Sequence, residues 1–195
     1  MGTSSQTRSV TPLHRSPLAQ PATVPQVFRA AARILAANGL HRGDFIPDAF
    51  DREMDVPHHL RPMSIVAALK CATTGDPHLP SLLSDEAIGT LALRLTVDGE
   101  GPVFGGIFDL EAHVDSWGDA EGRTAEDAVA MLEAVAVALM VRAEDVEEQA
   151  LAAVDARMVA EFGPVMAEWS PQQRDRYFGE LAAVHAEFAP QGVAA

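Results

Sequence analysis

The stretch that decides the fold runs from Thr124 to Phe162 and reads "TAEDAVAMLEAVAVALMVRAEDVEEQALAAVDARMVAEF". It contains no glycine and no proline, the two residues that most strongly interrupt helices. Its many alanines, leucines, methionines and glutamates favour helix, and Thr124 followed by Asp127 is a helix-capping pattern. The sequence therefore predicts helices over residues 125–141 and 143–162, which are either separate or continuous.

Segments on both sides of this stretch carry helix signals too. Each upstream segment has apolar residues at helical spacing, a capping residue or proline at its start and a glycine at its end. The upstream helices are predicted over residues 24–38, 62–74 and 85–97, with Thr23, Pro62 and Ser84 at their starts and Gly39, Gly75 and Gly99 at their ends. Ser170, Pro171 and Gln173 predict the start of a last helix. A further helical turn is expected near residues 48–54.

Two parts of the chain lack such a pattern. Residues 1–22 are rich in serine, threonine, proline and glutamine and show no apolar periodicity, which is typical of a disordered tail. Residues 98–122 are rich in glycine, which favours a long irregular connection with a short strand or hairpin around residues 103–108.

These segments together predict an all-α protein. We expect a compact bundle of five or six helices over residues 23–141, a helical C-terminal extension over residues 142–195 and a disordered N-terminal tail over residues 1–22. Small side chains, abundant alanine and few β-branched runs support packed helices over sheets.

The charge of the chain is uneven along its length. The net charge is −14, but residues 1–43 contain five arginines and no acidic residue, so the remainder carries −19. A body this acidic repels phosphate backbones, so direct binding of nucleic acid is not expected. No apolar run is long enough to span a membrane. The single cysteine, Cys71, is typical of a reduced, cytoplasmic protein and predicts no cysteine-rich metal site.

Residues 116–127, "SWGDAEGRTAED", allow a structural and a functional interpretation. In the first, they form a turn followed by the N-cap of the long helix. In the second, Trp117, Asp119 and Arg123 form a recognition patch beside an exposed helix N-terminus. The structural interpretation is favoured, because each side chain has a structural role available to it.

A metal site is a further hypothesis for the same region. His113 and Asp115 alternate along the chain and Asp119 is close by, and a histidine with two carboxylates can bind a transition metal. No nucleophile motif accompanies these residues, and Cys71 lies within an apolar helix pattern, as expected for a small buried side chain. The sequence predicts no catalytic residue and no cofactor.

The residues Trp117, Asp119, Gly122, Arg123 and Thr124 spell the motif W-x-D-x-x-G-R-T. With the segments "AARILAANGL" and "AALKCATTGDP", this motif resembles a family of short helical, actinobacterial and phage-associated proteins of unknown function. The resemblance covers about residues 25–140 and has no counterpart from Arg142 onward. It implies no established activity and supplies no catalytic residues.

The leading functional hypothesis is a non-catalytic helical interaction or regulatory protein. A protein partner or a second copy would dock on apolar residues of the C-terminal helices. These residues are Val146, Val154, Met158 and Phe162, and Tyr177, Phe178, Leu181 and Val184. The alternatives are a metal-dependent enzyme that uses His113, Asp115 and Asp119, and an acidic mimic of nucleic acid.

Overall fold

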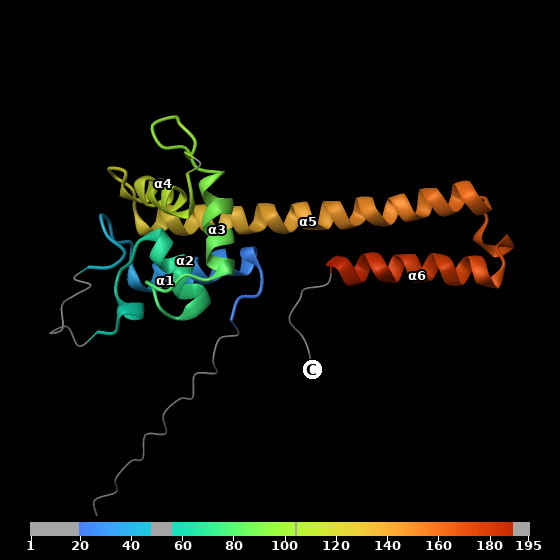
Figure 1. Ribbon diagram of the computed structural model, residues 1–195, viewed down its shortest axis with the longest axis horizontal. Helices are drawn as coiled ribbons and strands as arrows, with labels where there is room; N and C mark the ends of the chain where they lie inside the picture. The colour runs from blue at the N-terminus through green and yellow to red at the C-terminus, as the bar shows by residue number, and fades with distance from the viewer. Residues whose placement is uncertain (1–19, 48–55, 104, 189–195) are drawn as a thin grey trace, which may run out of the picture.

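The computed structural model describes residues 20–47, 56–103 and 105–188 (Figure 1). These residues form six α-helices, two short 3-10 helices and no β-strand, so the prediction of an all-α fold is confirmed. The α-helices are α1 (Val24–Asn38), α2 (Ile65–Thr74), α3 (Leu82–Ala92), α4 (Ile107–Asp119), α5 (Ala125–Phe162) and α6 (Pro171–Phe188), and the 3-10 helices are η1 (His58–Leu60) and η2 (Met166–Glu168). Residues 1–19 of the predicted tail and the predicted turn at 48–54 lie outside the described residues.

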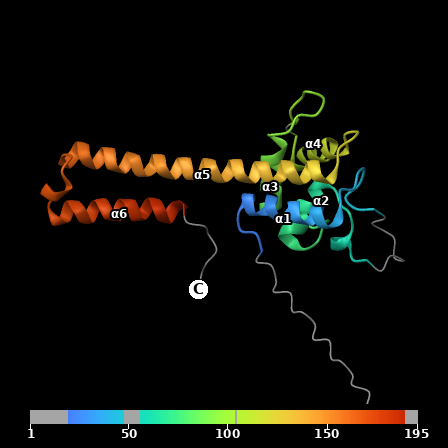
Figure 2. The same ribbon diagram turned by 180° about the vertical axis from the view of Figure 1, so that it is seen from behind.

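The molecule consists of a compact helical domain and a long arm (Figures 1 and 2). Helices α1 to α4 pack around the first part of α5, and α5 then continues out of the domain. Helix α6 folds back beside the far part of α5. Since α5 has 38 residues, it is about 57 Å long. None of the helices described is long and apolar enough to cross a membrane.

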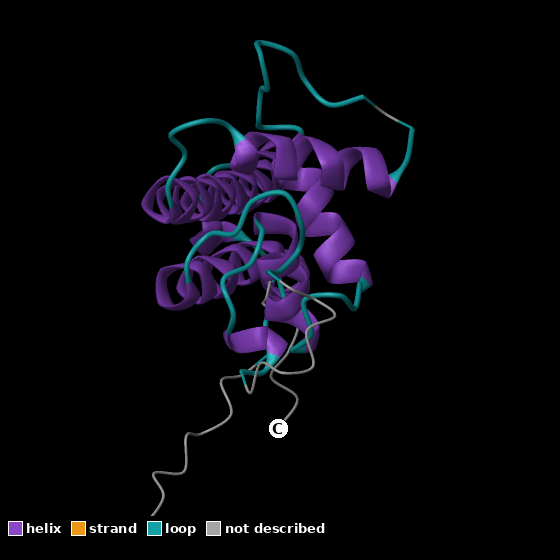
Figure 3. Cartoon of the chain, turned by 90° about the vertical axis from the view of Figure 1, so that its left-hand side faces the viewer, coloured by secondary structure: helices purple, strands orange, loops and turns teal. Residues whose placement is uncertain are grey.

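The core of the domain is built around α1, which packs against α2, α3 and α5. Figure 3 views the molecule from the domain end and shows the helices crowded together and joined by loops. The first seven residues of α2, from Ile65 to Cys71, are all buried, which explains why this segment is apolar on every side. Phe28 and Leu35 of α1 and Leu132 of α5 are fully buried in the same core.

Helix α2 begins three residues later than predicted. The helix does not open at Pro62 but follows Ser64 as its N-cap: the Ser64 hydroxyl accepts a hydrogen bond from Ala67 N at 3.1 Å. The residue before it, Met63, is held extended by backbone hydrogen bonds with Gly39 and His41. The predicted end at Gly75 is confirmed, with Gly75 in the left-handed conformation.

Helix α3 is also displaced from its predicted limits. Ser81 is the N-cap, and the predicted cap Ser84 is the reciprocal partner that accepts a hydrogen bond from Ser81 N at 2.8 Å. The helix ends at Ala92, well before Gly99. Asp98 and Gly99, at φ values of 53° and 84°, instead form a tight turn between Val97 and Glu100.

The glycine-rich stretch 98–122 contains helix α4, so the prediction of a long irregular connection with a strand at 103–108 is wrong. Ile107, Leu110, Val114 and Trp117 recur at helical spacing and pack on the core. Gly118 lies inside α4 and brings it close to α2, because a β-carbon there would be 3.2 Å from Ile65 Cδ1.

The long helix is continuous from Ala125 to Phe162, which decides between the two alternatives that the sequence left open. The predicted capping box is confirmed: Thr124 Oγ1 accepts from Asp127 N at 3.2 Å, and Asp127 Oδ2 accepts from Thr124 N at 2.9 Å. The hydrogen bond from Thr124 N, together with one that the Thr124 hydroxyl donates to the same oxygen, lowers the pKa of the Asp127 carboxyl. The predicted boundary between residues 141 and 142 therefore falls within one uninterrupted helix.

Candidate functional site

Trp117 and Arg123, two residues of the predicted recognition patch, stack on each other beside the start of α5. The Arg123 guanidinium carbon lies 3.6 Å from the centroid of the Trp117 ring, and Arg123 Nε donates to the Trp117 carbonyl at 3.4 Å. Both side chains are half-buried, and Trp117 also packs on the domain core. This cation–π contact fixes the turn between α4 and α5.

Asp119, the third residue of the predicted patch, binds the loop that follows α1. Its Oδ1 accepts a hydrogen bond from Gly43 N at 3.0 Å. Arg42 from the same loop donates to the Arg123 carbonyl. The structure therefore brings the three patch residues together and gives each of them a contact within the chain.

A small pocket lies between this loop, the start of α2 and the face of α4. Its volume is about 160 Å³, enough for a few water molecules. It is lined by Gly43, Asp44, Phe45, Ser64, Asp115 and Asp119. The pocket therefore presents three carboxylates and one hydroxyl.

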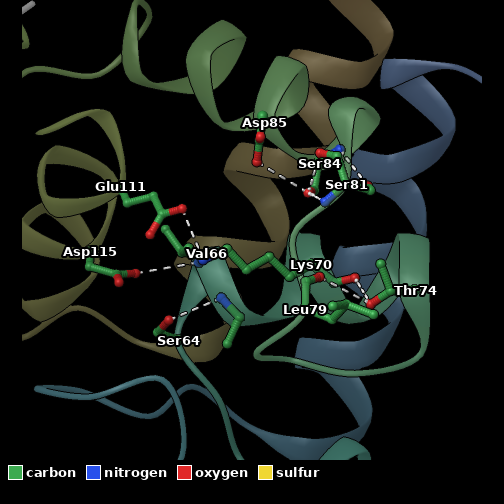
Figure 4. A network of polar contacts seen from close by, with 11 residues as sticks. Ser64, Val66, Lys70, Thr74, Leu79, Ser81, Ser84, Asp85, Glu111 and Asp115 are labelled. Carbon is green, nitrogen blue, oxygen red and sulfur yellow. Dashed lines mark hydrogen bonds and ion pairs between the residues drawn. The ribbon is translucent and has the colours of Figure 1, made fainter. Parts of the chain in front are cut away.

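Asp115 places its carboxylate at the N-terminus of α2. Asp115 Oδ1 accepts a hydrogen bond from Val66 N at 3.3 Å, where the helix has a partial positive charge (Figure 4). Burial raises the pKa of Asp115 to about 6, although hydrogen bonds from Val66 and Ser64 act in the opposite direction. Asp115 thus occupies the helix terminus at which an external anion would otherwise bind.

A buried ion pair joins α2 to α4 next to this pocket. Lys70 Nζ lies 2.9 Å from Glu111 Oε1, and the two side chains are only 6% and 10% exposed (Figure 4). The same ammonium group lies 4.4 Å from the centroid of the Phe45 ring. Lys70 is the single lysine of the chain. Sequence reasoning missed this pair, although a lone charge within the apolar run "IVAALKCA" is a signal for it.

His113 points away from the pocket that Asp115 and Asp119 line. Its Nε2 lies 3.1 Å from the Leu95 carbonyl oxygen. On a helix, residues two apart point in nearly opposite directions, so His113 and Asp115 diverge. Within residues 20–47, 56–103 and 105–188, no three histidine, cysteine or acidic side chains are grouped to hold a metal ion.

Cys71 is a buried side chain of the domain core, as expected. It is only 7% exposed. Burial, together with the nearby charge of Asp76, raises the pKa of its thiol to about 11. Since the thiolate is the reactive form, this cysteine is a poor nucleophile at neutral pH.

The arm has a second, smaller core of its own. Val154, Met158 and Trp169 are buried there, and the Trp169 indole donates to the Gly163 carbonyl at 2.9 Å. Half-buried residues complete this core, namely Phe162, Tyr177, Leu181 and Val184. Most of the residues predicted to dock a partner therefore pack within the arm, whereas Val146 and Phe178 are exposed.

Polar contacts fix how far α6 covers α5. Near the tip, Arg176 pairs with Glu161 at 2.8 Å and with Glu180 at 3.1 Å. At the other end of α6, His185 Nδ1 lies 2.8 Å from Glu147 Oε1. Helix α6 therefore covers α5 back to about Glu147.

The segment of α5 at residues 140–146, which we term the neck, lies between the domain and the cover of α6. All seven of its residues are exposed. The turns before it pack against α1, and those after it pack against α6 (Figures 1 and 2).

The model of a protein family of unknown function, DUF6197, matches residues 19–138. The chain belongs to the DUF6197 family. The match covers the helical domain, including the Trp117–Arg123 stack and the pocket, and it ends within α5 just before the neck. No curated protein and no solved structure matches the chain.

The end of the DUF6197 match agrees with the architecture of the molecule. Leu139 is the last residue that packs on the domain core, one position after the match ends. The neck and the arm therefore lie outside the DUF6197 region and have their own core and exposed surface.

Proposed function

We propose that this protein is a non-catalytic interaction protein. Its DUF6197 domain presents the arm, formed by the far part of α5 and by α6, to a protein partner. The observation that carries the proposal is the arm itself, which leaves the domain and exposes apolar side chains to solvent (Figure 1). The exposed apolar residues of the distal arm are Val159, Val165, Met166 and Phe178. Exposed apolar residues next to a polar rim are typical of protein interfaces.

The charge of the arm indicates what kind of partner it fits. Residues 142–188 contain ten acidic residues and four arginines. Complementary charge speeds association and selects partners, whereas like charge disfavours wrong ones. The arm therefore favours a protein with a basic surface over a second copy of this acidic chain.

The test compares three full-length proteins as bait in the same lysate. They are the wild type, the arm variant Val159→Ser/Phe178→Ser and the domain control Leu82→Ser, which changes a side chain that is 90% exposed on α3. We expect one partner, identified by mass spectrometry, to bind the wild type and the control but not the arm variant. Circular dichroism checks that all three remain folded.

Two results would contradict the proposal. A partner that binds all three proteins equally does not use the distal arm. A stable dimer in light scattering that the arm variant loses would instead assign the arm to self-association.

The acidic mimic of nucleic acid is a second candidate, and the ten acidic residues of the arm favour it. In this case the captured partner would be a DNA-binding protein, and duplex DNA would displace it from the arm. A partner that stays bound in excess DNA excludes this candidate. A metal-dependent reaction is not proposed, because His113 is turned away from Asp115 and Asp119.

The proposal places this interaction in the cytoplasm, which the single, buried cysteine supports. The motif resemblance further suggests an actinobacterial or phage-associated setting for the partner. Fractionation of the source cells, followed by detection of the protein in the soluble fraction, tests the location.

A further inference from the structure

One side of α3 is exposed and apolar although it belongs to the DUF6197 domain. Leu82 is the first residue of α3 and Leu93 directly follows its last residue, and they are 90% and 59% exposed. Glu86 and Gly89 lie between them. Because a helix turns by about 100° per residue, these four positions share one side of α3. We term the four residues Leu82, Glu86, Gly89 and Leu93 the α3 stripe.

Helix α4 borders the α3 stripe and adds to its apolar surface. A β-carbon at Gly89 would lie 3.7 Å from Leu110 Cδ1, and Leu110 is half-buried. Gly89 itself has no side chain that would hold a partner away from the backbone of α3. From Leu82 to Leu93 the stripe is about 17 Å long, which is three turns of helix. It therefore offers room for a helix of similar length.

The charge around the α3 stripe is acidic. Residues 82–110 contain five acidic residues and one arginine. This arginine, Arg94, is engaged within the chain, because its Nη1 donates to the Thr90 carbonyl at 2.7 Å. Glu86 of the stripe and Asp109 of α4 are both exposed. A partner that covers the leucines would consequently meet negative charge within and beside the contact.

We propose that the α3 stripe is a docking site for a basic amphipathic helix of a partner protein. The apolar side of this helix covers Leu82, Leu93 and Leu110, and lysines or arginines beside it pair with Glu86 and Asp109. Binding of this kind lays an apolar helix face on an apolar surface, and complementary charge selects the partner. The inference concerns the domain and not the arm, so it holds whether or not the arm binds a partner.

Other occupants fit the α3 stripe less well. Nucleic acids and anionic lipid surfaces are negatively charged, so the acids around the stripe repel them. In a two-fold contact between the stripes of two copies, the same surface of each copy meets its equivalent. Glu86 would then face a stripe that has no basic residue to pair with it. A basic helix supplies that charge.

The first experiment uses three synthetic peptides of about 18 residues, or five helical turns, as probes. The lysine peptide carries a leucine stripe flanked by lysines, the glutamate peptide has glutamate in place of lysine, and the scrambled peptide has the composition of the lysine peptide without the stripe. Each contains a photoreactive leucine. Mass spectrometry then locates and quantifies cross-links at residues 82–110 as the peptide concentration is raised.

Three full-length proteins are compared with these probes: the wild type, the stripe variant Leu82→Ser/Leu93→Ser and the arm variant Val159→Ser/Phe178→Ser as the matched control. We expect the lysine peptide to label residues 82–110 of the wild type and of the arm variant at the same concentration. The stripe variant should need a roughly tenfold higher concentration, because contacts of buried leucines are lost. Circular dichroism checks that all three proteins are folded.

A second experiment tests the charge of the contact. Glu86→Lys should weaken labelling of residues 82–110 by the lysine peptide and strengthen labelling by the glutamate peptide. Glu148→Lys, which changes an exposed acid of the arm, is the control and should alter neither.

Several outcomes would overturn the proposal. Equal labelling of residues 82–110 in the wild type and the stripe variant would show that the leucines do not bind the helix. Equal labelling by the lysine and scrambled peptides would reduce the contact to charge attraction. A dimer in light scattering that only the stripe variant loses would assign the stripe to a second copy.

Discussion

The buried pair of Lys70 and Glu111 is the contact that most depends on the exact packing of single residues. Its two side chains come from α2 and α4, and both lie inside the domain. A buried charge is tolerated only while its partner is present, because an unpaired charge in a core is strongly unfavourable. The pair therefore specifies how α4 sits on α2.

Replacing Lys70 by alanine should lower the free energy of unfolding by about 3–5 kcal/mol, because Glu111 would remain buried without its partner. The double change Lys70→Met/Glu111→Leu should recover most of this loss. Urea denaturation measures both. The exposed pair Arg29 and Glu133 provides the control, since Arg29→Ala should cost less than about 1 kcal/mol. If Lys70→Ala lowers the free energy of unfolding no more than Arg29→Ala does, Lys70 is not needed to compensate the charge of Glu111.

Asp115 gives the domain a specific pH dependence. Its pKa is raised from 3.8 to about 6 in the folded protein, so between these values the folded state holds a proton that the unfolded state has released. This group therefore makes the protein less stable as the pH rises from about 4 to 6, by at most about 3 kcal/mol.

The variant Asp115→Asn should lack this contribution while its amide oxygen can still accept from Val66 N. Measured from pH 4 to 7, the stability of the wild type relative to the variant should fall as the pH rises. Other carboxyl groups titrate in both proteins, so the difference between the two curves isolates Asp115. Parallel curves would mean that the pKa of Asp115 is not raised.

Among the helices, the starts of α5 and α6 could be predicted from local capping signals, whereas α4 has no such signal. The capping boxes that begin at Thr124 and at Ser170 each lie within four neighbouring residues. They mark the starts of α5 and α6. Helix α4 instead has Gly106 at its N-cap, which offers no capping side chain, and Ala120 at its C-cap in place of a left-handed glycine. Its apolar spacing was visible, but the surrounding glycines outweighed it.

The candidate site could be predicted only in part for a related reason. Trp117, Asp119 and Arg123 lie within seven residues of each other, so their proximity follows from the local sequence. The pairs Lys70–Glu111 and Val66–Asp115 join residues 41 and 49 positions apart, and they form only because α2 and α4 cross. No local pattern encodes such a crossing.

The N-cap of α5 offers a test at the level of one helix. Thr124→Ala removes a hydrogen bond to the first turn and should cost about 1 kcal/mol. Thr23 is a matched control, because it stands at the N-cap of α1 but its side chain makes no capping hydrogen bond there. Thr23→Ala should therefore leave thermal and urea unfolding nearly unchanged. Equal losses in both variants would show that the capping bond of Thr124 has no specific effect.

At the level of the whole molecule, two separate cores imply two units that share one helix. The core of the domain extends along α5 to Leu139, and that of the arm begins at Val154. A chain that ends at Arg142 should therefore keep the domain folded, with helical circular dichroism and a cooperative thermal transition. Loss of that transition would show that the domain needs the arm, and would weaken the proposal that the arm serves an external partner.

Because α5 is one continuous helix, a small tilt where the domain holds it is amplified into a larger displacement at its far end. The domain holds one end of α5, and about 22 residues, or roughly 33 Å, extend from Met140, the first residue of the neck, to Phe162. A tilt of about 10° at the neck would displace the tip by roughly 6 Å, given that helix length. Small changes in how the domain holds α5 would thus become large changes in where the tip can reach.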